Sequence, residues 1–165
     1  MVLGTESTGK TTLAERLTAH FGAGYVPEYG REAIGHSDAF TEADLYRVAV
    51  EHARRIEAAA AGPSPLLIVD TDIHITQSYA RFAFGRELDL PDHLYAANQA
   101  ALYLYLTPDV PYVQDGTRLS RPDRDRLDAC HRATLARHGV PFVEITGNWE
   151  HKFEKAKEWV KGLLG

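Results

Sequence analysis

The sequence predicts a three-layer α/β protein, in which a five-stranded parallel sheet carries helices on both faces. Two observations support this fold class. Short apolar runs alternate along the chain with longer segments of helical periodicity, which is typical of parallel strands joined by crossover helices. One run, residues 66–69 (LLIV), is continuously apolar, as expected for a strand buried on both faces. We interpret the 165 residues as a single domain.

The first two predicted strands are short. An apolar run at residues 1–3 forms the first, and residues 25–26 form the second, which Pro27 ends. Between them, apolar side chains at positions 13, 17 and 21 recur every four residues and predict a helix over residues 10–20. Glycines at positions 22 and 24 end that helix.

Cap and stop signals bound the longest predicted helix. Thr41 and Asp44 resemble a capping box at its start, and Gly62-Pro63 ends it at about residue 61. The buried strand at residues 66–69 follows. A helix to about residue 84 and a short helix over residues 91–99 complete this half of the chain.

The second half repeats the alternation. Residues 102–106 and 141–145 are apolar runs that predict the fourth and fifth strands. A loop and then a helix fill residues 109–138 between them. The last helix begins at about Trp149 and has apolar side chains at every third or fourth position.

Composition excludes several functional classes. The chain is 44% hydrophobic and 25% charged, with a net charge of −5, so we expect no nucleic-acid partner. No apolar run approaches the roughly 18 residues that cross a membrane, and we expect no membrane partner. Cys130 is the only cysteine, which fits a cytoplasmic protein without disulfides. A homo-oligomer is compatible with the sequence but does not follow from it.

Residues 4–11 (GTESTGKT), here called the glycine loop, match the pattern G-x-x-x-x-G-K-[ST] without a mismatch. The loop lies between a predicted strand and a predicted helix. Its glycines allow a tight turn that points backbone amides at an anion, and the helix N-terminus adds partial positive charge. The pattern predicts a site for the phosphates of a nucleotide. The residues assigned to it are Gly4, Glu6, Ser7, Thr8, Gly9, Lys10, Thr11 and Thr12.

Three side chains are predicted to serve phosphoryl transfer with Mg²⁺. Lys10 reaches the β- and γ-phosphates, and the Thr11 hydroxyl binds the metal. Asp70 ends the buried strand, where a carboxylate can hold Mg²⁺ opposite Thr11. The alternative for Asp70 is a cap on the following helix. Asp72, two residues further on, either contacts the substrate or caps that helix.

Residues 28–32 (EYGRE) lie at the carboxyl end of the second strand, the edge at which open α/β sheets bind ligands. Glu28 is our candidate for the general base that takes a proton from an acceptor hydroxyl, and its alternative role is an ion pair with Arg31. Tyr29 either contacts a planar ring of the substrate or belongs to the core. Arg31 either contacts the substrate or begins a helix.

Four arginines, at positions 118, 121, 124 and 126, follow the fourth strand. Arginines on a mobile segment can neutralise the charge on a transferred phosphoryl group. We therefore predict an arginine-rich lid over residues 115–127, with Arg118 and Arg121 as catalytic residues and Arg118 also on the nucleotide. Because aspartates at 123, 125 and 128 interleave with them, the alternative is a solvated helix face.

Other polar residues give weaker signals. The eight histidines show no metal-ligand spacing, and His52 is interpreted as a structural helix residue. His74, four residues after Asp70, is a candidate for the wall of the ligand crevice. Gly147-Asn148, directly after the fifth strand, is expected to lie against the adenine of ATP.

Four segments resemble, in the right order and over the whole chain, the nicotinamide riboside kinase domain of the NadR family, a branch of the P-loop AAA-type ATPase/kinase proteins. These segments are GTESTGKTTL, VPEYGRE, IVDTD and PDVPYVQDGTR. The resemblance implies a P-loop kinase fold. It also implies ATP-dependent phosphorylation of the ribose 5′-hydroxyl of nicotinamide riboside, which gives the mononucleotide for NAD salvage.

Pro27 departs from this family's pattern, because some members have a tryptophan there that clamps the nicotinamide ring. Another aromatic would then complete the clamp, with Tyr29, Tyr79 and Phe82 as candidates. Two alternatives stay open. The chain is a kinase for a deoxynucleoside or another metabolite, or it is a regulatory ATPase that transmits its nucleotide state to a partner.

Overall fold

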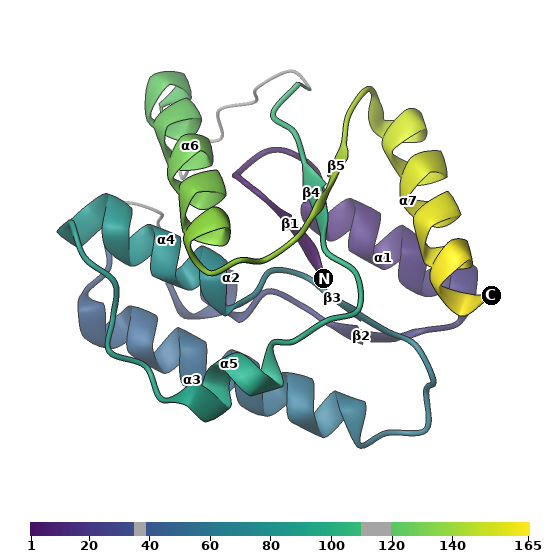
Figure 1. The fold of residues 1–165 in the computed structure, drawn as a ribbon, viewed down its shortest axis with the longest axis horizontal. Coiled ribbons are helices and arrows are strands. Elements are labelled where there is room, and N and C mark those ends of the chain that lie inside the picture. Colours follow the sequence, from purple (N-terminus) through teal and green to yellow (C-terminus); the bar gives the residue numbers. More distant parts are fainter. Residues whose placement is uncertain (35–38, 110–119) are drawn as a thin grey trace.

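The computed structural model describes residues 1–34, 39–109 and 120–165 (Figure 1). Its strands are β1 (Val2–Gly4), β2 (Gly24–Val26), β3 (Leu67–Val69), β4 (Leu104–Leu106) and β5 (Val143–Ile145). Its helices are α1 (Lys10–Phe21), α2 (Tyr29–Ala33), α3 (Glu42–Ala60), α4 (Ile73–Phe84), α5 (Asp92–Ala97), α6 (Arg121–Arg137) and α7 (Trp149–Leu164). Each corresponds to an element that the sequence predicts, with ends shifted by a few residues, except the short α2, which the sequence offers only as the alternative that Arg31 begins a helix. No helix in the described part of the chain is long and apolar enough to cross a membrane.

The prediction of a single five-stranded sheet is wrong. β1, β4 and β5 form a three-stranded sheet with β4 in the middle, whereas β2 and β3 form a separate pair, and all of these ladders are parallel. One bridge, between Val2 and Asp70, joins β1 to the end of β3. The ladder stops there because Thr71 turns out of the strand with a φ of 71°. The bridge nevertheless leaves β1 between β3 and β4, as expected for the strand before the glycine loop.

Helices cover both faces of these strands (Figure 1). Alternate residues of a strand point to opposite faces, so Val2 packs toward α1 and α7 while its neighbour Leu3 packs toward α4 and α6. The first of these layers contains Leu17 and Phe153, and the second contains Ile75 and Leu135. Three layers, as predicted, therefore enclose the apolar core.

Side-chain caps stabilise the N-terminal ends of α3 and α4. At the start of α3, the Asp44 amide donates to Thr41 Oγ1 at 3.2 Å and the Thr41 amide donates to Asp44 Oδ2 at 2.9 Å, which is the predicted capping box. At the start of α4, Asp72 Oδ1 accepts from the amides of His74 and Ile75. Each cap satisfies amides that a helix leaves without intrahelical partners.

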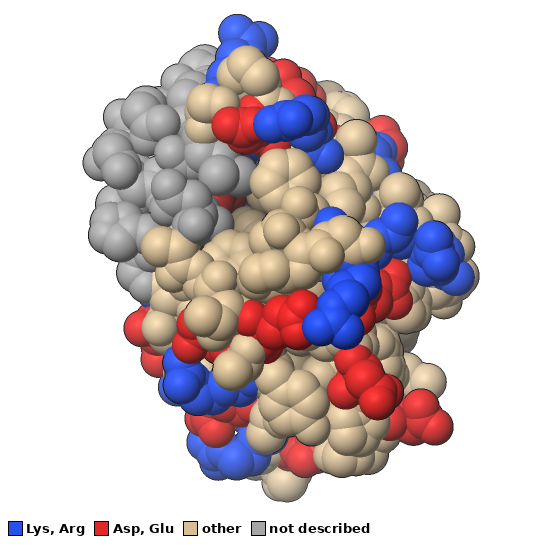
Figure 2. Space-filling view, turned by 90° about the vertical axis from the view of Figure 1, so that its left-hand side faces the viewer, with Lys and Arg blue, Asp and Glu red and all other residues tan. Residues whose placement is uncertain are grey.

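Basic and acidic side chains are interspersed on the face seen in Figure 2. Ion pairs within α3 are part of the surface charge pattern, such as Arg47 with Asp44 at 2.6 Å and Arg54 with Glu51 at 2.7 Å. Exposed pairs of this kind contribute at most about 1 kcal/mol each to stability. The surface pattern therefore bears on solubility more than on the fold.

Candidate active site

The glycine loop connects β1 to α1 in a tight turn. Gly4 has a φ of 138°, and a Cβ atom there would lie 2.6 Å from the carbonyl oxygen of Leu106, so only glycine fits. Thr8 Oγ1 and Lys10 Nζ both donate to the carbonyl oxygen of Thr5, at 2.8 and 3.0 Å. The lysine side chain is thereby held over the loop, at the N-terminus of α1, where the helix favours an anion.

Thr11 and Asp70 form the candidate metal site. The Thr11 hydroxyl donates to Asp70 Oδ2 at 2.7 Å, and Asp70 is fully buried at the end of β3. The alternative role of Asp70 as a helix cap is excluded, because Asp72 caps α4. A hydroxyl beside a carboxylate fits Mg²⁺, which takes few protein ligands and completes its shell with water and phosphate oxygens.

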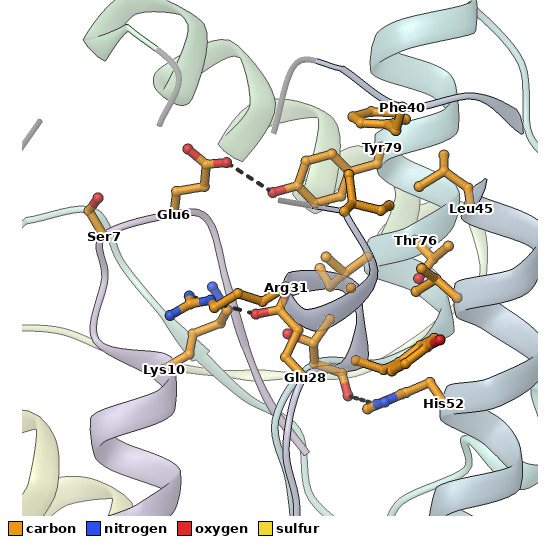
Figure 3. A pocket seen from close by; sticks show the side chains of 16 residues that line it. Glu6, Ser7, Lys10, Glu28, Arg31, Phe40, Leu45, His52, Thr76 and Tyr79 are labelled. Atoms are coloured by element: carbon orange, nitrogen blue, oxygen red, sulfur yellow. Dashed lines mark hydrogen bonds and ion pairs between the residues drawn. The ribbon is translucent and has the colours of Figure 1, made fainter. Parts of the chain in front are cut away.

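A cavity of about 220 Å³ opens beside the glycine loop (Figure 3). At one end it is polar, and the residues there are Glu6, Ser7, Lys10, Glu28 and Arg31. At the other end the walls come from α3 and α4 and from the chain before α3, and they include Phe40, Leu45, Val48, Ile75 and Tyr79. The cavity therefore joins the loop to a pocket that can enclose a ring.

Glu28 lies at the polar end of this cavity. It directly precedes α2, but its side chain makes no cap hydrogen bond, and Arg31 Nη2 lies 3.8 Å from Glu28 Oε2. The ion pair with Arg31, which the sequence offers as the alternative role of Glu28, is therefore present. Burial raises the pKa of Glu28, and the positive charge of Lys10 opposes that rise. A carboxylate with raised proton affinity beside a lysine suits the role of a general base.

Tyr79 forms an aromatic wall together with Phe40. Its hydroxyl donates to Glu6 Oε1 at 3.5 Å, and its ring meets the Phe40 ring edge to face, with centroids 6.0 Å apart. Burial and the negative charge of Glu6 raise the pKa of Tyr79, so the phenol keeps its proton. Tyr29 also lines the cavity, and the Arg55 guanidinium lies 4.4 Å from its ring centroid.

His52 lines the cavity, whereas the sequence predicts only a structural role for it in its helix. Its Nε2 lies 3.1 Å from the carbonyl oxygen of Thr71, and burial lowers the pKa of its imidazole (Figure 3). A carbonyl can only accept, so Nε2 carries the proton and Nδ1 is an acceptor. Leu45, Val48 and His52 share one helix face, which the periodicity does predict as inward, and that face lines the cavity.

Asp72 and His74 do not line the cavity. Asp72 is fully buried, and its Oδ2 lies 2.6 Å from His74 Nδ1 while its Oδ1 caps α4. The helix-cap alternative is confirmed for Asp72, and the proposed contact with substrate is not supported. The third clamp candidate, Phe82, is also absent from the cavity walls, whereas Tyr29 and Tyr79 belong to them.

The arginine cluster falls only partly on described residues. Arg118 and residues 115–119 of the predicted lid lie outside them. Arg121 is exposed at the first residue of α6, whereas Arg124 is 2% exposed. Arg126 pairs with Asp123 on the surface, as the solvated-face alternative expects. Thr12, in the first turn of α1, is exposed.

Comparison with known proteins adds independent information. A family model described as an AAA domain matches residues 1–152. The trifunctional NAD biosynthesis/regulator protein NadR of Salmonella typhimurium (strain LT2) is 28% identical over 172 aligned positions, which cover 99% of this chain and 42% of that protein. The chain thus spans less than half the length of this curated relative.

Solved structures share the fold. A NadR protein in complex with NR superposes with a TM-score of 0.80 at 23% identity, covering 98% of this chain and 50% of that one. Deoxyadenosine kinase from M. mycoides with bound dATP superposes with a TM-score of 0.61 at 12% identity, covering 97% of each chain. Both likenesses extend over nearly all of this chain, including the strands and helices that border the cavity.

Proposed function

The chain belongs to the AAA domain family, and on that premise we propose that it is an ATP-dependent nucleoside kinase. Its acceptor is nicotinamide riboside, and its product is nicotinamide mononucleotide for NAD biosynthesis. One observation carries the kinase assignment: Glu6, Ser7 and Lys10 belong both to the glycine loop and to the walls of the cavity. A phosphate donor in the loop and an acceptor in the cavity would therefore meet at Lys10.

Thr11 and Asp70 would hold Mg²⁺, and the ion would neutralise charge on the β- and γ-phosphates. Lys10 and the loop amides bind the same phosphates and orient the terminal one toward the cavity. Lys10 and Glu28 both line the polar end of the cavity, and the charge of Lys10 opposes the rise in the pKa of Glu28. The residues that bind phosphate are therefore adjacent to Glu28, the candidate general base.

Glu28 accepts the proton of the ribose 5′-hydroxyl as that oxygen attacks the γ-phosphorus. The bond from the γ-phosphorus to the oxygen that bridges to the β-phosphorus breaks, and ADP leaves. The new bond joins the 5′-oxygen to the phosphoryl group, and the proton stays on Glu28 until water removes it. The raised pKa of Glu28 favours this proton transfer.

The apolar end of the cavity suits the nicotinamide ring. Nicotinamide riboside carries a positive charge on its ring, and the π faces of tyrosine and phenylalanine attract cations. Tyr79 and Phe40 thus take the place of the tryptophan that some family members have at the position of Pro27. Tyr29 and Arg31 are the further substrate contacts that we propose at the polar end.

Two relatives support this acceptor. The NadR protein of Salmonella typhimurium is named for NAD biosynthesis, and a NadR protein of the same fold was solved with NR. The lid over residues 115–127, with Arg118 and Arg121 as its phosphate-contacting arginines, belongs to the same proposal. We also propose that residues 1–165 form one kinase domain.

The test is ADP release from Mg-ATP with a panel of nicotinamide riboside, cytidine, uridine, thymidine and deoxyadenosine. Strong stimulation by nicotinamide riboside alone is expected. Stimulation by deoxyadenosine instead would favour a deoxynucleoside kinase, to which the fold is also similar. ATP binding without stimulation by any nucleoside would contradict the kinase assignment and favour a regulatory ATPase.

A further inference from the structure

Trp149 packs directly on the last glycine of the glycine loop. A Cβ atom on Gly9 would lie 2.0 Å from Trp149 Cζ3 and 2.8 Å from Cε3, so the six-membered ring of the indole touches the Gly9 backbone. Gly9 has a φ of 86°, which also favours glycine. Trp149 is nevertheless 48% exposed. A large aromatic surface is thus open to solvent immediately beside the phosphate-binding turn.

The turn that carries Trp149 is fixed in place. Lys152, which is 1% exposed, donates to the carbonyl oxygen of Thr107 at 2.6 Å and pairs with Asp109 Oδ1 at 2.7 Å. Asp109 Oδ2 in turn accepts from the Gly147 amide at 2.6 Å. These contacts tie the segments after β4 and β5 together. The indole is consequently held on the loop and is not a loose surface side chain.

Trp149 and the cavity lie on opposite sides of the glycine loop. Apart from the glycine loop itself, the cavity is built from residues that follow β2 and β3 and from α3 and α4, whereas Trp149 follows β5. Because β1 lies between β3 and β4, β5 and the β2–β3 pair flank it on different sides (Figure 1). In-line phosphoryl transfer requires the attacking and leaving oxygens to lie on opposite sides of the transferred phosphorus.

With the acceptor in the cavity, the rest of the phosphate donor must leave the loop on the other side, toward Trp149. We propose that the exposed face of the Trp149 indole binds the base of the donor nucleotide by stacking. This inference rests on the proposed kinase function and assigns a base-binding residue to it. Stacking of a base on an aromatic side chain corresponds to an affinity gain on the order of 10- to 100-fold.

The chain offers a matched control, because its two tryptophans, Trp149 and Trp159, are both 48% exposed. Trp159 lines a separate surface groove with Leu102 and Leu163. In Trp159→Phe, only Trp149 emits, and titration with Mg-ATP without acceptor is expected to change its fluorescence to saturation. In Trp149→Phe, only Trp159 emits, and no saturable change is expected.

Affinity measurements complete the test. Trp149→Ala is expected to raise the Kd for ATP by 10- to 100-fold, while Trp159→Ala leaves it unchanged. Inorganic tripolyphosphate has phosphates but no base, so its Kd should be the same in Trp149→Ala and in the unmodified protein. Equal weakening of ATP and tripolyphosphate would show that Trp149 only supports the loop, and would overturn the proposal. Unchanged ATP affinity would overturn it as well.

These outcomes are distinguishable from a failure of the kinase assignment. The binding assays contain no nucleoside acceptor, so they report on the donor site alone. A wrong kinase assignment would leave the Trp149 response to ATP intact while no nucleoside accepts phosphate. Absence of ATP binding by the unmodified protein would overturn both proposals.

Discussion

The hydroxyl of Thr11 donates a 2.7 Å hydrogen bond to Oδ2 of Asp70, so the first turn of α1 and the end of β3 meet at one point. The two residues are 59 positions apart in the chain, and the fold alone brings them together. Asp70 is fully buried, so its carboxylate must be satisfied by partners such as this hydroxyl. The pair defines the place at which we propose that Mg²⁺ binds.

Asp70→Asn keeps the size of the side chain but removes the negative charge that would hold the ion. We expect kcat to fall on the order of 10²-fold or more, and the Mg²⁺ concentration for half-maximal rate to rise. Chelation of divalent ions should abolish the activity of the unmodified protein, and added Mg²⁺ should restore it. An unchanged Mg²⁺ requirement in Asp70→Asn would remove this residue from the metal site.

Lys10→Ala tests the glycine loop itself. The Lys10 ammonium contacts the loop through a hydrogen bond to the Thr5 carbonyl, so its loss should cost about 1.5–3 kcal/mol of stability. Phosphoryl transfer should fall on the order of 10²- to 10³-fold, because Lys10 stabilises the charge of the transferred group. Thermal unfolding and steady-state rates measure the two effects separately. Retained phosphorylation would contradict the proposed site.

Glu28→Gln tests the general base. We expect kcat to fall about 10²- to 10⁴-fold while the KM for ATP changes little. In the unmodified protein, the rate should rise with pH as Glu28 loses its proton, with a midpoint above the ordinary carboxyl value of 4.5. The variant should lose this dependence. An unchanged rate would exclude Glu28 as the base, and Asp72 is a poor substitute because it caps α4.

The same raised pKa has a consequence for stability. The folded state binds a proton on Glu28 more tightly than the unfolded chain does, so stability falls as pH rises through the raised pKa. Glu28→Gln should therefore raise the free energy of unfolding at pH 8 more than at pH 4. Denaturant unfolding at the two pH values measures the difference, and an equal effect at both would contradict the burial of this carboxyl.

Tyr79 is the proposed wall for the acceptor ring. Tyr79→Ala should raise the KM for the nucleoside on the order of 10-fold, since it removes an aromatic contact, and should leave the KM for ATP nearly unchanged. Tyr79→Phe keeps the ring and loses only a 3.5 Å hydrogen bond to Glu6, so a small effect is expected. A larger loss in the phenylalanine variant than in the alanine variant would contradict the ring-contact role.

His131 predicts a pH dependence of stability that is unrelated to catalysis. Burial lowers its pKa to about 3, and its Nδ1 lies 2.7 Å from Ser78 Oγ. Between pH 6.5 and pH 3 the unfolded chain binds a proton that the folded state does not, so stability falls as pH falls. This histidine should account for about 2 kcal/mol of loss between pH 7 and pH 5.

His131→Gln should remove this part of the pH dependence of stability, as measured by denaturant unfolding at pH 7 and at pH 5. His93→Asn is the matched control, since His93 is exposed on α5. An undiminished pH dependence in His131→Gln would mean that other groups cause the acid destabilisation.

Local sequence patterns predict the strands, the helices and the glycine loop because each depends on near neighbours. Periodicity, the Thr41–Asp44 capping box and glycine stops all act over a few residues. The split of the sheet is not visible in such patterns: β1 and β3 share a single bridge, between Val2 and Asp70, and Thr71 then leaves the strand direction with a positive φ. A β-branched residue gives no local sign of such a turn.

The residues of the candidate site fall into the same two groups, those that local sequence patterns predict and those that they do not. Lys10, Thr11 and Glu28 belong to compact motifs, so their roles follow from the sequence. The contact of Trp149 with Gly9, and the part of His52 in the cavity wall, arise from packing between segments far apart in the chain. Periodicity predicts that His52 faces inward, but it does not tell a core from a cavity.

The central claim is the transfer of a phosphoryl group from ATP to a nucleoside, and γ-labelled ATP tests it most directly. Incubation with Mg²⁺ and nicotinamide riboside should place the label in nicotinamide mononucleotide, one phosphate per ADP formed, with the phosphate on the 5′-oxygen by mass spectrometry. Label found only in inorganic phosphate, with nicotinamide riboside unchanged, would contradict the account.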